Sequence, residues 1–302
     1  MKLTTILTIL PVGQFLTSAG QNFRQQFNDL CNKKDTAGQE KILTQWKVAM
    51  PNDPELYVAY YNFYVQKSMT EMLRLDKNVP KGKEALQLMN TDTTKKEPAG
   101  FMFSEIYYKP EILSKGYAYI DTAIQKFNDR LDMRFGKIYM PGKTTDYEQF
   151  TTEIIKTIEY SNKNKNAWLW TDNIKIEKPK EFFLGSIQNY VNQLYNTGDD
   201  ALLDNMKRIA ETVLKFYPDH VESLSNISIA CMVKGDFDSA LTPLLKAEKI
   251  SPKDYIVLNN IAHCYTQKGD KKNAIKYYEL TVKYGDKQAK EFANQKLTEL
   301  KK

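Results

Sequence analysis

A spacing of 34 residues recurs through the last third of the chain. Several pairs of identical residues obey this offset, and asparagine extends it to three copies. These residues are Pro218 and Pro252, Gly235 and Gly269, Asp236 and Asp270, Ala240 and Ala274, and Asn192, Asn226 and Asn260. A period of about 34 residues is typical of a helix–turn–helix unit whose copies stack into a solenoid. Solenoids present concave surfaces to partners, so the period predicts an architecture before it predicts a function.

The periodicity inside each copy supports that interpretation. Residues at i, i+3, i+4 and i+7 form one stripe on a helix. The small side chains of Ala240 and Ala274 allow two helices to approach closely, and Gly235 and Gly269 suit the turn between them. The stripe residues are Leu224, Ile227, Ser228 and Cys231 in one copy and Leu258, Ile261, Ala262 and Tyr265 in the next.

On these residues the chain resembles the tetratricopeptide repeat (TPR) family. The closing Pro252 and the apolar residues four positions after the two alanines match the rest of the family's pattern. The resemblance implies an all-α fold, a right-handed α–α superhelix, with a TPR array over residues 181–286. Asp286 stands where a closing proline would be, so residues 287–302 are expected to form a C-terminal capping helix.

Residues 21–180 predict a divergent TPR-like helical region. Two polar stretches, near 68–110 and 162–180, interrupt it and predict loop insertions. Four tyrosines follow Pro51 at the spacing of one helical stripe, which favours a buried position over a sugar-binding platform. They are Tyr57, Tyr60, Tyr61 and Tyr64.

The second polar stretch also contains two tryptophans. Trp168 and Trp170 are two residues apart, which predicts an extended segment with both rings on one side. Structural packing against the solenoid is the favoured interpretation, and a ligand platform is the alternative.

The N-terminus has the features of a cleavable signal peptide. Residues 1–20 combine one lysine, a short apolar segment and small residues before Gln21. Pro11 and Gly13 break the apolar segment, so a membrane span is not expected there. No cysteine lies at the cleavage position, which argues against a lipoprotein. We therefore expect a periplasmic or secreted bacterial protein, with no integral membrane segment after cleavage.

The residues that carry chemistry are sparse. The formal net charge is +6 without a dense basic stripe, so no nucleic-acid partner is expected. His220 and His263 are the two histidines, too few for a typical zinc site or a histidine-based nucleophile. Gly136–Thr144 resembles a phosphate-binding loop, but five residues separate its glycines where the motif has four. We expect no catalytic residues, no metal and no cofactor.

Three cysteines are present, an odd number for an exported chain. Cys231 lies on the stripe of its repeat and Cys264 lies beside Tyr265, so we interpret both as small core residues. A bridge between these two in adjacent repeats remains open.

The resemblance also nominates a binding surface, because the first helices of successive TPR units line a concave groove. The asparagine amides could hold a peptide backbone or bond between repeats, and both interpretations stay open. Glu222, Ser225 and Ile256 stand where the carboxylate-clamping subfamily has Lys and Arg, so that function is not implied. The groove residues expected from this mapping are Asn192, Ser225, Asn226, Ile229, Met232, Asn259, Asn260, His263 and Gln267.

These sequence features support two alternative hypotheses about function. The first is a non-catalytic scaffold or adaptor of the bacterial cell envelope that binds a protein or peptide in the groove. The alternative is a ligand-binding or accessory component of an envelope system that processes glycan or peptide. That alternative would use the polar insertion and the segment around Trp168 and Trp170. The missing catalytic constellation favours the first.

Overall fold

The computed structural model describes residues 19–79, 82–91 and 97–302. The chain divides into two compact units, Met1–Asn128 and Asp129–Lys302. The predicted signal peptide lies outside the described residues except for Ala19 and Gly20, with which the first helix begins. Cleavage there stays a prediction.

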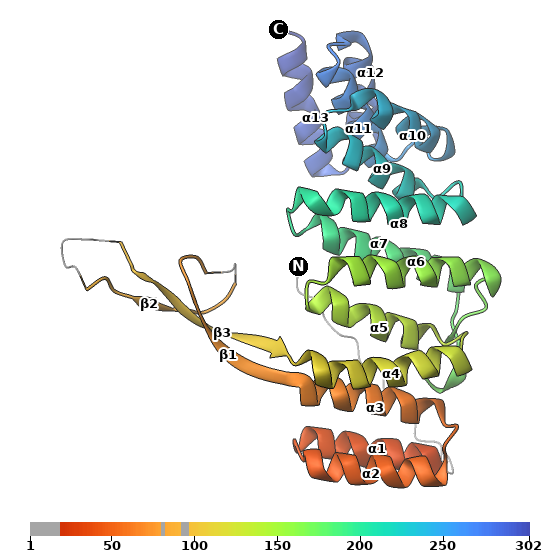
Figure 1. Ribbon diagram of the computed structural model, residues 1–302. Coiled ribbons are helices and arrows are strands. Elements are labelled where there is room, and N and C mark those ends of the chain that lie inside the picture. The colour runs from red at the N-terminus through yellow and green to blue at the C-terminus, as the bar shows by residue number, and fades with distance from the viewer. Residues whose placement is uncertain (1–18, 80–81, 92–96) are drawn as a thin grey trace. The chain divides into compact units, whose positions relative to one another are not determined.

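Helix pairs form the body of the first unit (Figure 1). Asp35 and Asp53 cap the second and third helices, since their side chains accept hydrogen bonds from Gly38 N and Glu55 N. Trp46 is fully buried, and its Nε1 donates to Asp53 Oδ2 at 2.9 Å. The helices are α1 (Ala19–Asn32), α2 (Thr36–Ala49), α3 (Pro54–Ser68) and α4 (Pro110–Lys126).

The tyrosine stripe lies on α3 and packs against α4. Tyr60 and Tyr61 are buried, and the Tyr60 ring stacks on Tyr119 with centroids 4.2 Å apart. Tyr57 and Tyr64 are half-buried. The prediction that this stripe belongs to the core is confirmed for the two middle tyrosines.

A β-sheet occupies the first polar stretch, which was expected to be a loop. Its strands are β1 (Met69–Asp76), β2 (Leu86–Leu88) and β3 (Gly100–Tyr108), antiparallel in the order β1–β3–β2. We call these strands and the described residues between them the arm, which extends away from α3 and α4 (Figure 1). Lys109 N donates to Ser68 O at 2.9 Å and closes its base. Aromatic residues and Ile106, which have high β propensity, are frequent in β3, while the Lys-rich residues lie between strands.

Consecutive antiparallel helix pairs build the second unit (Figure 1). In the part of the chain that the structure describes, helices dominate both units, so the all-α repeat class is confirmed and the arm is its main departure. The helices are α5 (Leu131–Lys143), α6 (Tyr147–Lys163), α7 (Pro179–Tyr195), α8 (Leu203–Phe216), α9 (Val221–Val233), α10 (Phe237–Ile250), α11 (Tyr255–Gln267), α12 (Lys271–Tyr284) and α13 (Lys287–Leu300).

The repeated Gly-Asp pairs make the turns within the last two helix pairs. Gly235 and Gly269 adopt φ of 76° and 75°, a left-handed conformation that suits glycine after a helix. Asp236 then caps α10, and Asp270 caps α12 through Asn273 N at 3.1 Å. The sequence pattern therefore specifies where each helix ends and the next begins.

The second polar stretch packs into the core of the second unit. Trp168 is 2% exposed, and its ring centroid lies 5.7 Å from those of Tyr160 and Phe183. Trp170 packs edge-on against Phe182 at 5.5 Å. Structural packing is confirmed for this segment. Instead of a plain loop it contains β4 (Leu169–Trp170) and β5 (Ile174–Lys175), which pair antiparallel.

The cysteines pack as small apolar residues. Cys264 is fully buried in the core of the last repeats, and burial raises the pKa of its thiol to about 11. Cys231 is half-buried against the same core. All three thiols are free.

Candidate partner-binding groove

Two of the three periodic asparagines, Asn192 and Asn226, belong to a hydrogen-bonded cluster between α7 and α9. Asn226 is 5% exposed, and its Nδ2 donates to Gln188 Oε1 at 2.8 Å. Gln188 Nε2 donates to Asn192 Oδ1 at 2.9 Å. Gln188 therefore bridges the two asparagines, and Asn226 has its partner inside the chain. This is the inter-repeat bonding that the sequence left open as one of two interpretations.

The other residues expected in the groove have mixed environments. Ser225 is buried, while Ile229 and Asn260 are half-buried and Gln267 is exposed. His263 is half-buried, with its ring edge-on to Phe237 at 6.0 Å. Burial lowers the pKa of His263, and Lys296 lowers it further.

A pocket of about 390 Å³ lies beside Asn259, between α11 and α13. We call it the C-terminal groove. Exposed apolar side chains line it, with Ile256 at 55% and Phe292 at 43% exposure. Its full lining is Tyr255, Ile256, Asn259, Asp286, Gln288, Ala289 and Phe292.

The polar end of the groove is held in place by hydrogen bonds. Asp286 caps α13, because its Oδ1 accepts from Ala289 N at 2.8 Å. Its Oδ2 accepts from the Tyr255 hydroxyl at 3.0 Å. These bonds, that from Ala289 N foremost, lower the pKa of Asp286, so it stays a carboxylate at neutral pH. The hydrogen bond to Asp286 raises the pKa of the Tyr255 side chain, so Tyr255 remains a neutral hydroxyl.

Asn259 supplies a second acceptor. Its Oδ1 is buried and has no hydrogen-bond partner among the described residues. A buried polar atom without a partner is uncommon in native proteins and calls for an explanation. Asn259 and Asp286 both line the pocket beside its apolar wall, and the Asn259 oxygen itself is covered. A ligand that supplies N–H donors next to an apolar side chain satisfies both features.

Sequence reasoning found one side of this groove and missed the other. Asn259 was named from its position on the first helix of a repeat. Phe292 comes from the capping helix, which the repeat pattern does not describe. An aromatic residue on a terminal helix rich in Lys, Glu and Gln was the available signal.

The last two helix pairs identify the fold. They are offset by 34 residues, their alanines Ala240 and Ala274 are fully buried, and their turns have the same conformation. The chain has the tetratricopeptide repeat fold. TPR units of this kind form extended interaction surfaces.

A family model described as "Regulator of microtubule dynamics protein 1-3" matches residues 229–302, which include the whole C-terminal groove. No curated protein matches the chain.

Solved TPR structures are similar at low identity. YrrB, a TPR protein described as having an unusual peptide-binding site, is 12% identical with a TM-score of 0.40, covering 84% of this chain and 97% of its own. The C-terminal part of a TPR protein from Cytophaga hutchinsonii is 12% identical with a TM-score of 0.41, covering 87% and 78%. Yeast Tom70 is 13% identical with a TM-score of 0.34, covering 94% and 58%. These TM-scores lie below 0.5, so the fold assignment rests on the chain's own helices.

In the described part of the chain, no three His, Cys, Asp or Glu side chains are placed to hold a metal ion. Across residues 19–302 apart from the two short gaps, no helix is both long and apolar enough to cross a membrane. The segment that resembles a phosphate-binding loop lies almost wholly within α5, so it does not form such a loop.

Proposed function

We propose that the protein is a non-catalytic scaffold of the bacterial cell envelope that binds a protein or peptide segment in its C-terminal groove. The observation that carries this proposal is the unpartnered Asn259 oxygen beside the exposed Ile256 and Phe292. An apolar wall with a few fixed polar groups is the usual composition of a binding pocket.

The acceptors define the ligand chemistry. Asp286 carries negative charge, and Asn259 offers a carbonyl oxygen, so backbone N–H groups or a Lys or Arg side chain fit the polar end. An aliphatic or aromatic side chain fits between Ile256 and Phe292. A free C-terminal carboxylate would face Asp286 and is disfavoured.

A peptide-library selection followed by fluorescence anisotropy tests the proposal. Selected peptides should carry an apolar residue next to Lys or Arg. Phe292→Asp should weaken their binding by about tenfold or more, because it places a charge in the apolar wall. Asn259→Ala should weaken binding by about threefold to tenfold through loss of one hydrogen bond.

Ile250→Asp is the matched control, since Ile250 on α10 is 39% exposed and lies outside the groove lining. It should leave binding unchanged, and circular dichroism should show all variants folded. Equal binding by Phe292→Asp and Ile250→Asp would refute the groove as the site.

Export rests on the composition of residues 1–20. Mass spectrometry of the native protein should find Gln21 as the N-terminus. An intact Met1 on protein from the cytosol would contradict export without affecting the groove.

A further inference from the structure

Lysines recur at the 34-residue spacing on both edges of the last repeats. Lys215, Lys249 and Lys283 lie in the last turns of α8, α10 and α12, and we call these three residues the lysine row. Lys234 and Lys268 lie at the ends of α9 and α11. Because consecutive helices run antiparallel (Figure 1), the lysine row and these two lysines lie on opposite edges of the second unit.

On the opposite edge each of the two lysines has an acidic partner in the preceding helix pair. Lys234 Nζ lies 2.7 Å from Asp204 Oδ1, and Lys268 pairs with Asp238. The two aspartates are themselves 34 residues apart, so the same ion pair recurs from one repeat to the next. The opposite edge therefore neutralises its periodic lysines.

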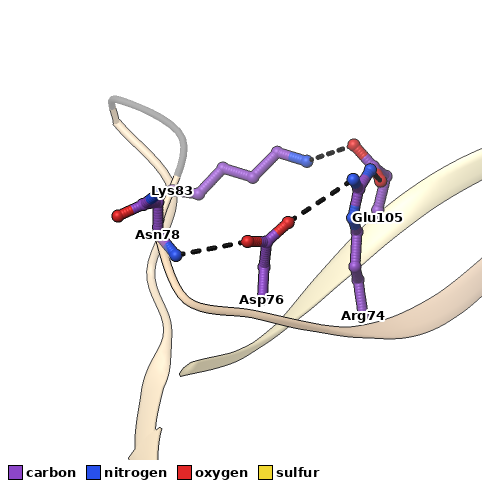
Figure 2. A network of polar contacts seen from close by, with 5 residues as sticks. All are labelled: Arg74, Asp76, Asn78, Lys83 and Glu105. Carbon is purple, nitrogen blue, oxygen red and sulfur yellow. Dashed lines mark hydrogen bonds and ion pairs between the residues drawn. The ribbon is translucent and has the colours of Figure 1, made fainter. Parts of the chain in front are cut away.

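The arm also pairs cations with carboxylates (Figure 2). Arg74 Nη1 and Lys83 Nζ each lie 3.0 Å from a carboxylate oxygen of Glu105. Arg74 Nη2 lies 3.5 Å from Asp76 Oδ2. The hydrogen bonds from Lys83 and Arg74 lower the pKa of Glu105, which stays charged at neutral pH. Two cations and two carboxylates leave this network without net charge.

The lysine row has no such partners. Its three side chains are exposed, and none of them forms an ion pair among the residues that the structure describes. Lys215 Nζ lies 5.4 Å from the ring centroid of Phe216, and Lys283 Nζ lies 5.2 Å from that of Tyr284. These contacts leave the ammonium groups charged. A lysine in the last turn of a helix complements the helix dipole, which accounts for its position but does not cancel its charge.

Hydrogen bonds between repeats hold the lysine row on one continuous edge. Lys246 Nζ on α10 donates to Pro218 O, in the connection that follows α8, at 2.6 Å. The Tyr255 hydroxyl at the start of α11 donates to Asp286 Oδ2, in the turn that follows α12, at 3.0 Å. The C-terminal ends of α8, α10 and α12 therefore follow one another along this edge, which we call the row edge.

Charge distinguishes the two edges when each is taken as the same eight positions in three successive repeats. The row edge has six lysines against four acidic residues, whereas the opposite edge has five lysines against five aspartates. An anionic surface is therefore the electrostatic complement of the row edge alone. The row edge is residues 215–222, 249–256 and 283–290, and the opposite edge is residues 200–207, 234–241 and 268–275.

An apolar residue follows each lysine of the row, and this decides the kind of anionic partner. These residues, Phe216, Ile250 and Tyr284, obey the same 34-residue spacing. Ile250 is 39% exposed, and the two aromatic side chains are half-buried. Lysine beside aromatic and aliphatic side chains is typical of protein surfaces that rest at the headgroup level of a bilayer. A layer of lipid phosphates meets charges at any spacing, whereas a folded acidic protein must match the spacing of the repeats.

We propose that the row edge binds the surface of a bilayer that contains anionic phospholipids, with the lysine row facing the lipid phosphates. Each lysine near an anionic surface strengthens binding by about fivefold, so the attachment is reversible. It is peripheral and needs no helix that crosses the membrane. It does not rest on the C-terminal groove, because none of the three row lysines lines that pocket.

Vesicle flotation of the full chain tests the proposal, using phosphatidylcholine vesicles that contain or lack about 40% phosphatidylglycerol. At about 0.1 M salt the chain should float with the anionic vesicles and not with the neutral ones. Raising the salt to about 0.5 M should release most of the chain, because salt screens exposed charges. Lys249→Ala/Lys283→Ala should lower the partition coefficient by about tenfold or more, since it removes two of the three row charges.

Lys234→Ala/Lys268→Ala is the matched control. It changes the net charge by the same amount in the same two helix pairs, but on the opposite edge. It should change the partition coefficient by less than about threefold. All four lysines are exposed, so circular dichroism should show both double variants folded.

Four results would overturn the proposal. The full chain could fail to float with the anionic vesicles. An equal loss of binding in the two double variants would assign it to overall charge. Flotation with neutral vesicles that persists at about 0.5 M salt would assign it to the apolar segment within residues 1–20. Binding of fluorescent polyglutamate but not of vesicles, weakened in Lys249→Ala/Lys283→Ala, would make an acidic polypeptide the occupant.

Discussion

The pair α9/α10 and the pair α3/α4 are both antiparallel helix pairs, but the chain connects them differently. A short turn through Gly235 and Asp236 joins α9 to α10. The whole arm joins α3 to α4, and one backbone hydrogen bond from Lys109 N to Ser68 O closes its base. The faces of α3 and α4 still pack through Tyr60 and Tyr119. The packed faces hold such a pair together, so the turn position is free to carry an added element.

The same two regions use leucine in opposite ways. In the last repeats Leu258 is fully buried among apolar neighbours. In the arm Leu73 is 71% exposed. A leucine in the core stabilises the fold, whereas an exposed leucine contributes little to it.

The largest expected effect comes from truncating the buried leucine of this pair. Leu258→Ala should lower the free energy of unfolding by about 2–5 kcal/mol, because it leaves a cavity in the core. Leu73→Ala should change it by less than about 0.5 kcal/mol, since the side chain is exposed. Urea denaturation followed by circular dichroism measures both.

Hydrogen exchange by mass spectrometry gives the control, because it follows the two units separately. Leu258→Ala should accelerate exchange in α11 and α12 and leave α3 and α4 unchanged. A large loss of stability from Leu73→Ala would mean that the arm belongs to the core of its unit, and the comparison would fail.

The difference between the regions also explains what the sequence could predict. The last repeats follow a fixed pattern, so the positions of Ala240, Gly269 and Asp270 predicted their helices and turns. The arm has no repeating pattern, and both of its faces are largely exposed. Apolar residues in β1 therefore do not alternate cleanly with polar ones, as Met72 and Leu73 show. The Lys-rich residues between the strands then dominated the interpretation as a loop.

The C-terminal groove could also be predicted only in part from the sequence. Asn259 followed from its place in a repeat, but the pairing of Asn226 with Gln188 joins two helices whose side-chain contacts no motif specifies. Phe292 lies on a helix beyond the repeat pattern. Sites completed by a capping helix depend on how that helix docks, which tertiary packing decides.

A smaller effect tests whether the repeat turns are fixed by backbone conformation. A Cβ at Gly269 would meet no atom within 4 Å, but its φ is 75°. Gly269→Ala should therefore cost about 1–2 kcal/mol through left-handed strain alone. Gly185 within α7 is the matched control, since it also has open space around a new Cβ. Gly185→Ala should stabilise by about 0.5–1 kcal/mol. Thermal or urea unfolding that gave both substitutions the same sign would contradict the account of the turn.

The smallest expected effect is a pH dependence confined to the second unit. Both histidines, His220 and His263, belong to that unit. Burial lowers the pKa of each, so the unfolded chain binds protons more readily than the folded one. Their contribution to stability is full above the unfolded pKa of about 6.5 and is lost as the pH falls below it. Hydrogen exchange at pH 7.5 and pH 5.5, corrected for intrinsic rates, should show the loss in the second unit only.

The variant His220→Asn/His263→Gln should remove most of this pH dependence. Asparagine is chosen at position 220 because His220 caps α9, accepting from Ser223 N at 3.3 Å, and asparagine is a good N-cap. A pH dependence of the same size in the double variant would assign it to other groups. The first unit has no histidine. An equal change in its hydrogen exchange between the two pH values would contradict the assignment of this effect to His220 and His263.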